Sequence, residues 1–183
     1  MFPWKKIYPS PKERTPWVNK KLFIIVHHTG TWSGTTAWVI DWLYRRDDYA
    51  SCHALVWEEG EAYKFGESED ILWHAGVSKW LRYENLNAYS IGIEILWPID
   101  GTFNDAQRKT VRDLIQHYMA VYWIPKENVL RHADVTQHWG YSERWILWDW
   151  KRPARKTDVA DSFWKIDRTT WKQYQDSLIP KRL

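Results

Sequence analysis

The chain has 183 residues, of which 44% are hydrophobic and 27% are charged, so we expect a single soluble domain with a sizeable core. A single cysteine, Cys52, excludes an intrachain disulfide framework, and no apolar run is long enough to predict membrane insertion. The formal net charge of +3 is too small and too dispersed to favour nucleic acid as a partner.

The N-terminal arm, residues 1–20, contains four prolines and no export signal. Prolines at this spacing preclude a regular helix, so we expect an extended strap along the surface. Without a signal peptide, synthesis in the cytoplasm is expected. Residues 21–183 are expected to form one domain, with a polar and aromatic insert at about 133–155.

Residues 23–31 are the stretch around which the rest of the chain is organised. Four apolar residues lead into His27 and His28 and then into Thr-Gly-Thr, which predicts a buried central strand that ends in a loop. Because side chains alternate along a strand, the two histidines point to opposite faces, and at most one serves a given site. A pair of structural histidines at a strand end is the alternative.

Further elements follow from hydrophobic periodicity and turn signals. The strand expected over 90–96 places Glu94 on the same face as Gly92, a glycine that makes room for another group. A Glu94 that points to solvent from an exposed sheet face is the alternative. We also expect a helix over 35–46, a hairpin of strands 51–57 and 62–65, a helix capped by Asn104 that runs to about 122, a strand over 128–131 that ends in His132, and helices over 159–164 and 170–178.

Tryptophan is unusually frequent, with 16 residues spread from Trp4 to Trp171. We expect many of them to fill the core, because a large aromatic side chain buries more area than any other, and some between 139 and 150 to be partly exposed. Exposed indole rings could stack on sugars or line a groove, and extra packing is the alternative.

Two imidazoles and a carboxylate supply the three protein ligands of a hydrolytic zinc site, which keeps one position for water. His27, His132 and Asp158 fit this count. A nearby carboxylate such as Glu94 could take the proton of that water and pass it to a leaving amine, and Lys156 could stabilise the oxyanion of a tetrahedral intermediate. Alternatively, Lys156 is a surface lysine and Asp158 caps the helix that follows it.

Seven short motifs follow one another along the chain: Val26-His27-His28-Thr29, Ser51-Cys52-His53, Trp73-His74-Ala75-Gly76-Val77-Ser78, Asn87-Ala88-Tyr89-Ser90-Ile91-Gly92-Ile93-Glu94, Asn104-Asp105-Ala106-Gln107, Arg131-His132-Ala133-Asp134 and Lys156-Thr157-Asp158. In this order they resemble zinc-dependent N-acetylmuramoyl-L-alanine amidases of the type 2 family, over about residues 23–164. The family includes phage lysozyme-type amidases, cytosolic wall-recycling amidases and peptidoglycan recognition proteins. The resemblance implies a mixed β-sheet flanked by helices, a zinc ion, and cleavage of the amide between the lactyl group of N-acetylmuramic acid and L-alanine.

The resemblance also implies roles for single residues. His27 resembles the first zinc ligand, His132 the second and Asp158 the third, where other branches place a cysteine. Glu94 resembles the catalytic carboxylate of the recycling branch, and it is expected to take the place of a tyrosine that phage lysozyme-type members use. Lys156 resembles the lysine two residues before the third ligand.

Other positions carry weaker implications. His74 and Asn87 resemble positions of the substrate groove. Cys52 stands where the phage lysozyme-type members keep the tyrosine, and it is expected to pack rather than to bind metal. The segment from His132 to Asp158 is longer than the family pattern, which leaves Asp134 and Asp149 as alternative third ligands.

We therefore expect an α/β fold, a single domain with a central mixed β-sheet flanked by helices and a zinc site at strand ends. The expected function is that of a peptidoglycan amidase, acting as a phage or prophage endolysin, with a cytosolic muropeptide-recycling amidase as the alternative. The expected partner is bacterial peptidoglycan or a muropeptide, bound by a monomer whose modest basic charge suits an anionic wall polymer. Alternatives from other classes are a non-catalytic peptidoglycan-binding protein and a lectin-like, tryptophan-rich sugar binder.

Overall fold

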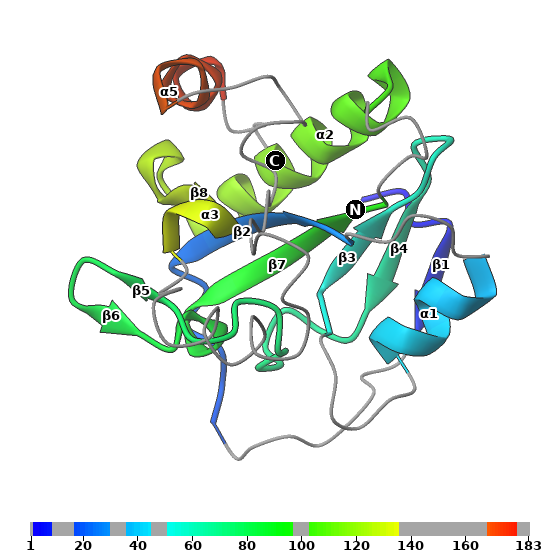
Figure 1. Cartoon of the computed structure of the whole chain (residues 1–183), viewed down its shortest axis with the longest axis horizontal. Coiled ribbons are helices and arrows are strands. Elements are labelled where there is room, and N and C mark those ends of the chain that lie inside the picture. Colours follow the sequence, from blue (N-terminus) through cyan, green and yellow to red (C-terminus); the bar gives the residue numbers. More distant parts are fainter. Residues whose placement is uncertain are drawn as a thin grey trace, which may run out of the picture.

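The computed structural model describes residues 2–8, 17–29, 36–44, 51–96, 103–135 and 168–178. A six-stranded sheet with the strand order β1-β4-β3-β7-β2-β8 forms the centre of the molecule (Figure 1). Its strands are β1 (Lys6–Tyr8), β2 (Phe23–His28), β3 (Ala54–Val56), β4 (Ala62–Phe65), β7 (Ser90–Ile95) and β8 (Val129–Arg131). A small second sheet pairs β5 (Lys79–Trp80) with β6 (Tyr83–Glu84).

The central sheet is mixed. Strand β2 runs parallel to both of its neighbours, β7 and β8, and β3 runs parallel to β7. Strands β3 and β4 form the predicted antiparallel hairpin, and β1 joins β4 in parallel. The predicted α/β fold with a mixed central sheet is therefore confirmed.

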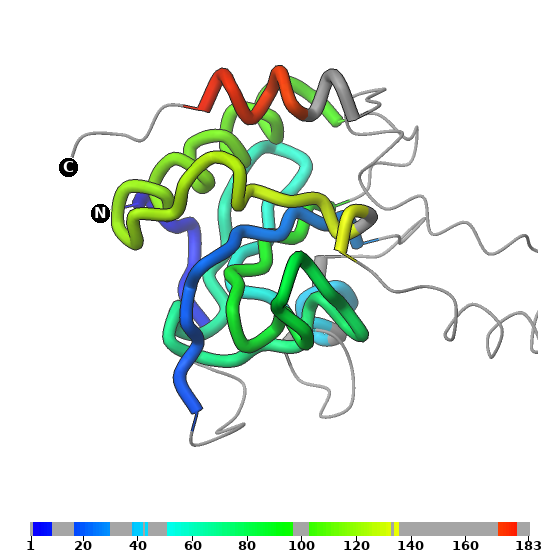
Figure 2. The backbone as a smooth tube through the Cα atoms, turned by 90° about the vertical axis from the view of Figure 1, so that its left-hand side faces the viewer, coloured from blue at the N-terminus to red at the C-terminus, as the bar shows by residue number. Residues whose placement is uncertain are grey.

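Helices cover both faces of this sheet. On one face, α2 (Asp105–Tyr122) and α5 (Arg168–Ser177) enclose an apolar cluster with alternate residues of β2 and β7. On the other face, α1 (Thr36–Tyr44) packs its buried Val39 and Leu43 against Leu55 of β3. Figure 2 shows α5, in red, above α2 and the strands. On the face of α1, Phe23 and Ile25 of β2 pack against Ala75, Leu86 and Val135 rather than against α1 itself. With both of its faces covered, β2 is buried up to His27, as its apolar sequence requires.

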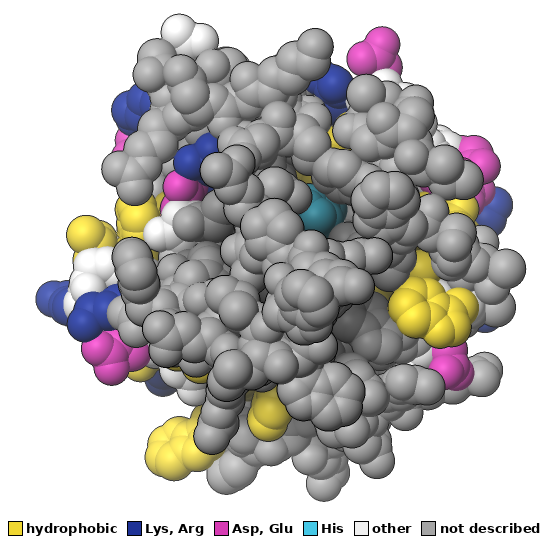
Figure 3. Space-filling view, in the orientation of Figure 1, with side chains coloured by type: hydrophobic (Ala, Val, Ile, Leu, Met, Phe, Trp, Pro, Cys, Tyr) yellow, Lys and Arg dark blue, Asp and Glu magenta, His cyan; other side chains and the backbone are white. Residues whose placement is uncertain are grey.

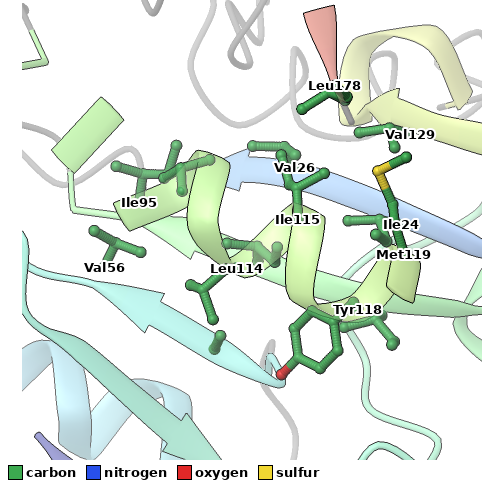
Figure 4. Packing of buried hydrophobic residues seen from close by; sticks show 14 of the residues in the cluster. Ile24, Val26, Val56, Ile95, Leu114, Ile115, Tyr118, Met119, Val129 and Leu178 are labelled. Atoms are coloured by element: carbon green, nitrogen blue, oxygen red, sulfur yellow. The ribbon is translucent and has the colours of Figure 1, made fainter. Parts of the chain in front are cut away.

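The helix α2 begins where the sequence predicts. The side chain of Asn104 accepts a hydrogen bond from the backbone N–H of Gln107 at 2.9 Å, and the side chain of Gln107 accepts one from the N–H of Asn104 at 3.2 Å. This reciprocal capping satisfies two backbone donors at the helix start. The buried stripe of α2 includes Leu114, Ile115 and Tyr118, which face the strands in Figure 4.

The hairpin turn docks closely against α2. A Cβ atom at Gly60 would lie 2.8 Å from the backbone of Ala106, and its φ of +79° is one that glycine adopts without strain. The side chain of Thr110 donates to the carbonyl oxygen of Gly60 at 2.6 Å. The turn predicted between the two strands thus also fixes the hairpin to the helix.

Most predicted elements are found within two or three residues, but short ones were missed. Within the arm, Lys6–Tyr8 does not merely lie along the surface but adds the edge strand β1. The strands β5 and β6 and the short 3-10 helices Leu86–Ala88 and Lys126–Asn128 were also not predicted. The predicted helix over 159–164 and the insert beyond α3 (His132–Val135) lie outside the described residues. In the described part of the chain, no helix is long and apolar enough to cross a membrane.

The expectation that many tryptophans fill the core is wrong for the described part of the chain. Of the tryptophan side chains described there, only Trp57 is buried. Trp4 and Trp80 are half-buried, and the four exposed ones are Trp17, Trp38, Trp73 and Trp123. The core is instead built from branched aliphatic residues, because these pack well between parallel strands and helices.

Candidate active site

The ends of β2 and β7 place a histidine and a glutamate side by side. His27 and Glu94 are register partners on these parallel strands, so their side chains project from the same face. Only 1% of the surface of His27 and 6% of that of Glu94 is exposed. The alternative of a solvent-facing Glu94 is thereby excluded. A carboxylate this well buried acts on nearby charges more strongly than it would in water.

His74 lies over Gly92 on the same face. A Cβ atom at position 92 would be 2.4 Å from Cγ of His74, so only glycine leaves room for the imidazole ring. This confirms the expectation that Gly92 makes room for another group. Nδ1 of His74 lies 3.0 Å from Nε2 of His27, and its Nε2 lies 3.3 Å from Oγ of Ser90. Burial, followed by the charges of two nearby histidines, holds the pKa of His74 well below its usual value, so this ring is neutral near pH 7.

His132 reaches the site from the end of β8. Strand β8 is the parallel neighbour of β2, so both strands end at the same edge of the sheet. The ring centroids of His132 and His27 are 4.6 Å apart. Nε2 of His132 donates a hydrogen bond to the carbonyl oxygen of Ala75 at 3.2 Å. The two histidines that the sequence places at strand ends are therefore adjacent.

Asp134 is bound to Arg131 by a largely buried ion pair. Its Oδ1 lies 2.6 Å from Nη2 of Arg131, and its Oδ2 accepts from Nε at 2.8 Å and from the backbone N–H at 3.2 Å. Both carboxylate oxygens are thus committed to holding the chain on either side of His132. This arrangement does not favour Asp134 as the alternative third ligand.

His53 is a fully buried histidine to which the sequence analysis gave no role. Its Nδ1 accepts the backbone N–H of Gly92 at 3.0 Å, and its Nε2 lies 3.1 Å from the carbonyl oxygen of Asp70. Burial lowers its pKa to about 4, so the ring is neutral near pH 7. The signal in the sequence was its place in the motif Ser51-Cys52-His53. Cys52 itself is buried among apolar side chains, as expected, and burial raises the pKa of its thiol.

Asn87 supports the loop that carries His74. Its Oδ1 accepts the backbone N–H groups of His74 at 3.0 Å and of Ala75 at 2.8 Å. The side chains of His74 and Asn87 are both buried, and the contacts described here lie within the protein. That these two residues contact substrate stays a prediction, and the geometry shows them holding the site together.

The described part of the site offers a metal ion two imidazole ligands, His27 and His132. Among the described residues, no group of three or more His, Cys, Asp or Glu side chains is arranged to hold a metal. The predicted third ligand, Asp158, lies outside the described residues, as do Lys156 and the alternative Asp149. Two adjacent, buried imidazoles fit two of the three protein ligands that a catalytic zinc site uses. Figure 3 shows a histidine side chain visible near the middle of one face of the molecule.

Comparison with known proteins identifies relatives of this site. A family model described as N-acetylmuramoyl-L-alanine amidase matches residues 18–146, which include His27, Glu94 and His132 but end before Lys156 and Asp158. The 1,6-anhydro-N-acetylmuramyl-L-alanine amidase AmpD of Haemophilus influenzae is 28% identical over 129 residues, 70% of this chain and 58% of that protein. The chain thus spans a little over half the length of this curated relative.

Solved structures share the fold. A crystal structure of a selenomethionine AmpD derivative matches with a TM-score of 0.64 at 20% identity and covers 92% of both chains. A mutant endolysin from Bacillus subtilis matches with a TM-score of 0.59 at 27% identity, over 80% of this chain and 94% of that one. An AmpD protein and an endolysin therefore share this architecture with the chain.

Proposed function

Because the chain belongs to the N-acetylmuramoyl-L-alanine amidase family, we propose that it is a zinc-dependent amidase that cleaves the bond between N-acetylmuramic acid and L-alanine. The observation that carries this proposal is the convergence of His27, His132 and Glu94 on one edge of the sheet. Two imidazoles that bind a metal and a carboxylate that transfers a proton are groups that metal-dependent hydrolysis of an amide uses.

In the proposed mechanism, His27, His132 and Asp158 would hold the zinc ion. When bound, zinc supplies a water of lowered pKa and a Lewis acid for the scissile carbonyl. Glu94 takes a proton from the attacking water and delivers it to the leaving amine of L-alanine. Lys156 stabilises negative charge on the carbonyl oxygen. The buried position of Glu94 next to His27 supports its part in this scheme.

The substrate proposed first is polymeric peptidoglycan, cleaved by an endolysin, as the similarity to a B. subtilis endolysin supports. The second candidate is a soluble 1,6-anhydro-muropeptide, which the name of the H. influenzae relative supports. The loss of turbidity of purified cell walls, measured beside the release of peptide from a soluble anhydro-muropeptide, separates the two. Activity on the soluble substrate alone would overturn the endolysin role.

Metal analysis tests the site itself. We expect about one zinc per chain in the purified protein and a loss of zinc in the variants His27→Ala, His132→Ala and Asp158→Ala. His117→Ala, which removes a histidine of α2 outside this site, serves as the matched control and should keep its zinc. If Asp158→Ala keeps full zinc affinity, another residue is the third ligand. Tight binding to cell walls with neither zinc nor cleavage would instead establish a non-catalytic binding protein.

A further inference from the structure

We propose that residues 74 and 75 of one loop determine which ring nitrogen of each metal-binding histidine carries the hydrogen. The ring of His74 forms a hydrogen bond with the ring of His27, and the carbonyl group of Ala75 forms one with the ring of His132. This inference rests on the proposed function, because it treats His27 and His132 as metal ligands. Their orientation by other protein groups matters, since a ligating imidazole must present a nitrogen without hydrogen to the metal.

The assignment for His132 follows from one hydrogen bond. Its Nε2 lies 3.2 Å from the carbonyl oxygen of Ala75, and a carbonyl oxygen can only accept. Nε2 of His132 therefore carries the hydrogen. In the neutral ring, Nδ1 is then the nitrogen that offers a lone pair.

The assignment for His27 follows from a chain of three hydrogen bonds. The hydroxyl of Ser90 donates to the carbonyl oxygen of Leu86 at 2.6 Å, so its one hydrogen is committed. Nε2 of His74, 3.3 Å from that hydroxyl, must then be the donor. A neutral His74 carries its single ring hydrogen there, and its Nδ1 can only accept. Nε2 of His27, 3.0 Å away, must donate to it.

Both histidines thus offer Nδ1 through the action of neighbouring residues on one loop. The loop is held in place from two sides. Oδ1 of Asn87 accepts the backbone N–H groups of His74 and Ala75, and Gly92 provides the slot for the ring of His74. His74 is therefore a positioning residue that acts through His27.

The tautomers can be read without metal or substrate. In long-range ¹H–¹⁵N correlation spectra of the metal-free protein, we expect hydrogen on Nε2 of His27, His74 and His132. In His74→Leu, which removes the acceptor, we expect His27 to populate the form with hydrogen on Nδ1 and zinc affinity to fall by about 10- to 100-fold. His74→Asn, whose Oδ1 can take the place of Nδ1, should recover most of this affinity.

Two further variants complete the test. Gly92→Ala leaves every hydrogen-bonding residue in place but displaces the ring of His74, so zinc affinity should again fall, and this variant serves if His74→Leu does not fold. His117→Leu is the control that should leave tautomers and affinity unchanged.

The outcomes separate this inference from the proposed function. Unchanged His27 tautomer and unchanged zinc affinity in folded His74→Leu or Gly92→Ala would overturn the inference and leave the amidase proposal standing. Hydrogen on Nδ1 of His27 in the wild-type protein would also overturn it. The expected tautomers in a protein that binds no zinc would support the loop's role and overturn the proposed function.

Discussion

The two faces of the β2–β7 strand pair carry different kinds of side chain, although the same two strands build both faces. The face under α2 carries Ile24 and Val26 of β2 and the isoleucines of β7, all without exposed surface. The opposite face carries the buried apolar side chains of Phe23 and Ile25 on β2. It also carries the polar residues of the site, His27, Ser90 and Glu94, and Gly92, which has no side chain. One face is thus apolar throughout, whereas the other combines a small apolar cluster with a network of hydrogen-bonded polar groups.

This difference shows how stability and chemistry are linked. Because side chains alternate with a period of two, a slip of one residue between β2 and β7 would turn the isoleucines of β7 to the face of His27 and the polar set to the face under α2. The apolar face therefore fixes the register, and the register places His27 beside Glu94. We therefore expect substitutions on the face under α2 to lower the stability of the fold, and substitutions of the polar residues on the opposite face to lower the catalytic rate.

The largest effect is expected for Glu94→Gln on the polar face. The amide keeps the shape of the side chain but cannot take a proton, so turnover of a muropeptide should fall by about 10²- to 10⁴-fold. Zinc content and the unfolding midpoint in urea should stay close to wild type. Glu84→Gln, which changes an exposed glutamate paired with Lys79, is the matched control. Wild-type turnover in Glu94→Gln would remove Glu94 from the mechanism.

Ile115→Ala tests the apolar face. Ile115 is fully buried in the cluster between α2 and the sheet, so its truncation leaves a cavity and should lower the free energy of unfolding by about 2–5 kcal/mol. Turnover per folded molecule should stay unchanged at temperatures where the variant is folded. Trp123→Ala, at a side chain that is 90% exposed, should change stability by less than about 0.5 kcal/mol. A strong loss of turnover in folded Ile115→Ala would mean that the two faces are not separable.

The sequence predicts the apolar face better than the polar one. The apolar stripe of α2 and its Asn104 cap are visible in the sequence. Strand β7 can be predicted from the alternation of its isoleucines with other residues. Strands of two or three residues, such as β1 and β5, have no period to detect and exist because a partner strand is present. Their positions depend on tertiary contacts that periodicity does not record.

On the polar face, the strand-end histidines and Glu94 could be placed together because parallel strands end at one edge. The contact between His74 and His27 could not, because it depends on the path of the loop between β4 and β5. Gly92 gave the one advance signal that some group lies against the strand. The prediction that many tryptophans are buried was wrong for a related reason. The size of a residue indicates how much area its side chain can bury, but the fold determines whether that side chain is buried.

The pH dependence of stability tests the polar face again. His53 has a pKa of about 4 in the folded protein against about 6.5 when unfolded, so the unfolded chain binds more protons between these values. The contribution of His53 to the free energy of unfolding is therefore fully present above pH 6.5 and is lost as the pH falls toward 4. This loss amounts to about 3 kcal/mol. The lowered pKa of His74 acts in the same direction.

His53→Asn isolates this contribution. Its Oδ1 can accept the N–H of Gly92 in place of Nδ1, but it does not titrate. Urea unfolding of the chelator-treated proteins between pH 4.5 and 7.5 should give a flatter profile for the variant than for the wild type. Parallel profiles would show that the burial of His53 does not govern acid sensitivity.

The smallest effect is expected at Asn104, which has two roles on the apolar side. Its Oδ1 caps α2, and its Nδ2 donates to the carbonyl oxygen of Glu58 at 2.6 Å, which ties the helix to the hairpin. Asn104→Ala removes both and should cost about 0.5–2 kcal/mol of unfolding free energy. Asn104→Ser keeps an oxygen for the cap but lacks the side-chain amide that donates to Glu58, so it should retain most of the stability. Equal losses in the two variants would assign the effect to the tie rather than the cap, and unchanged turnover in both would place this end of α2 outside the chemistry.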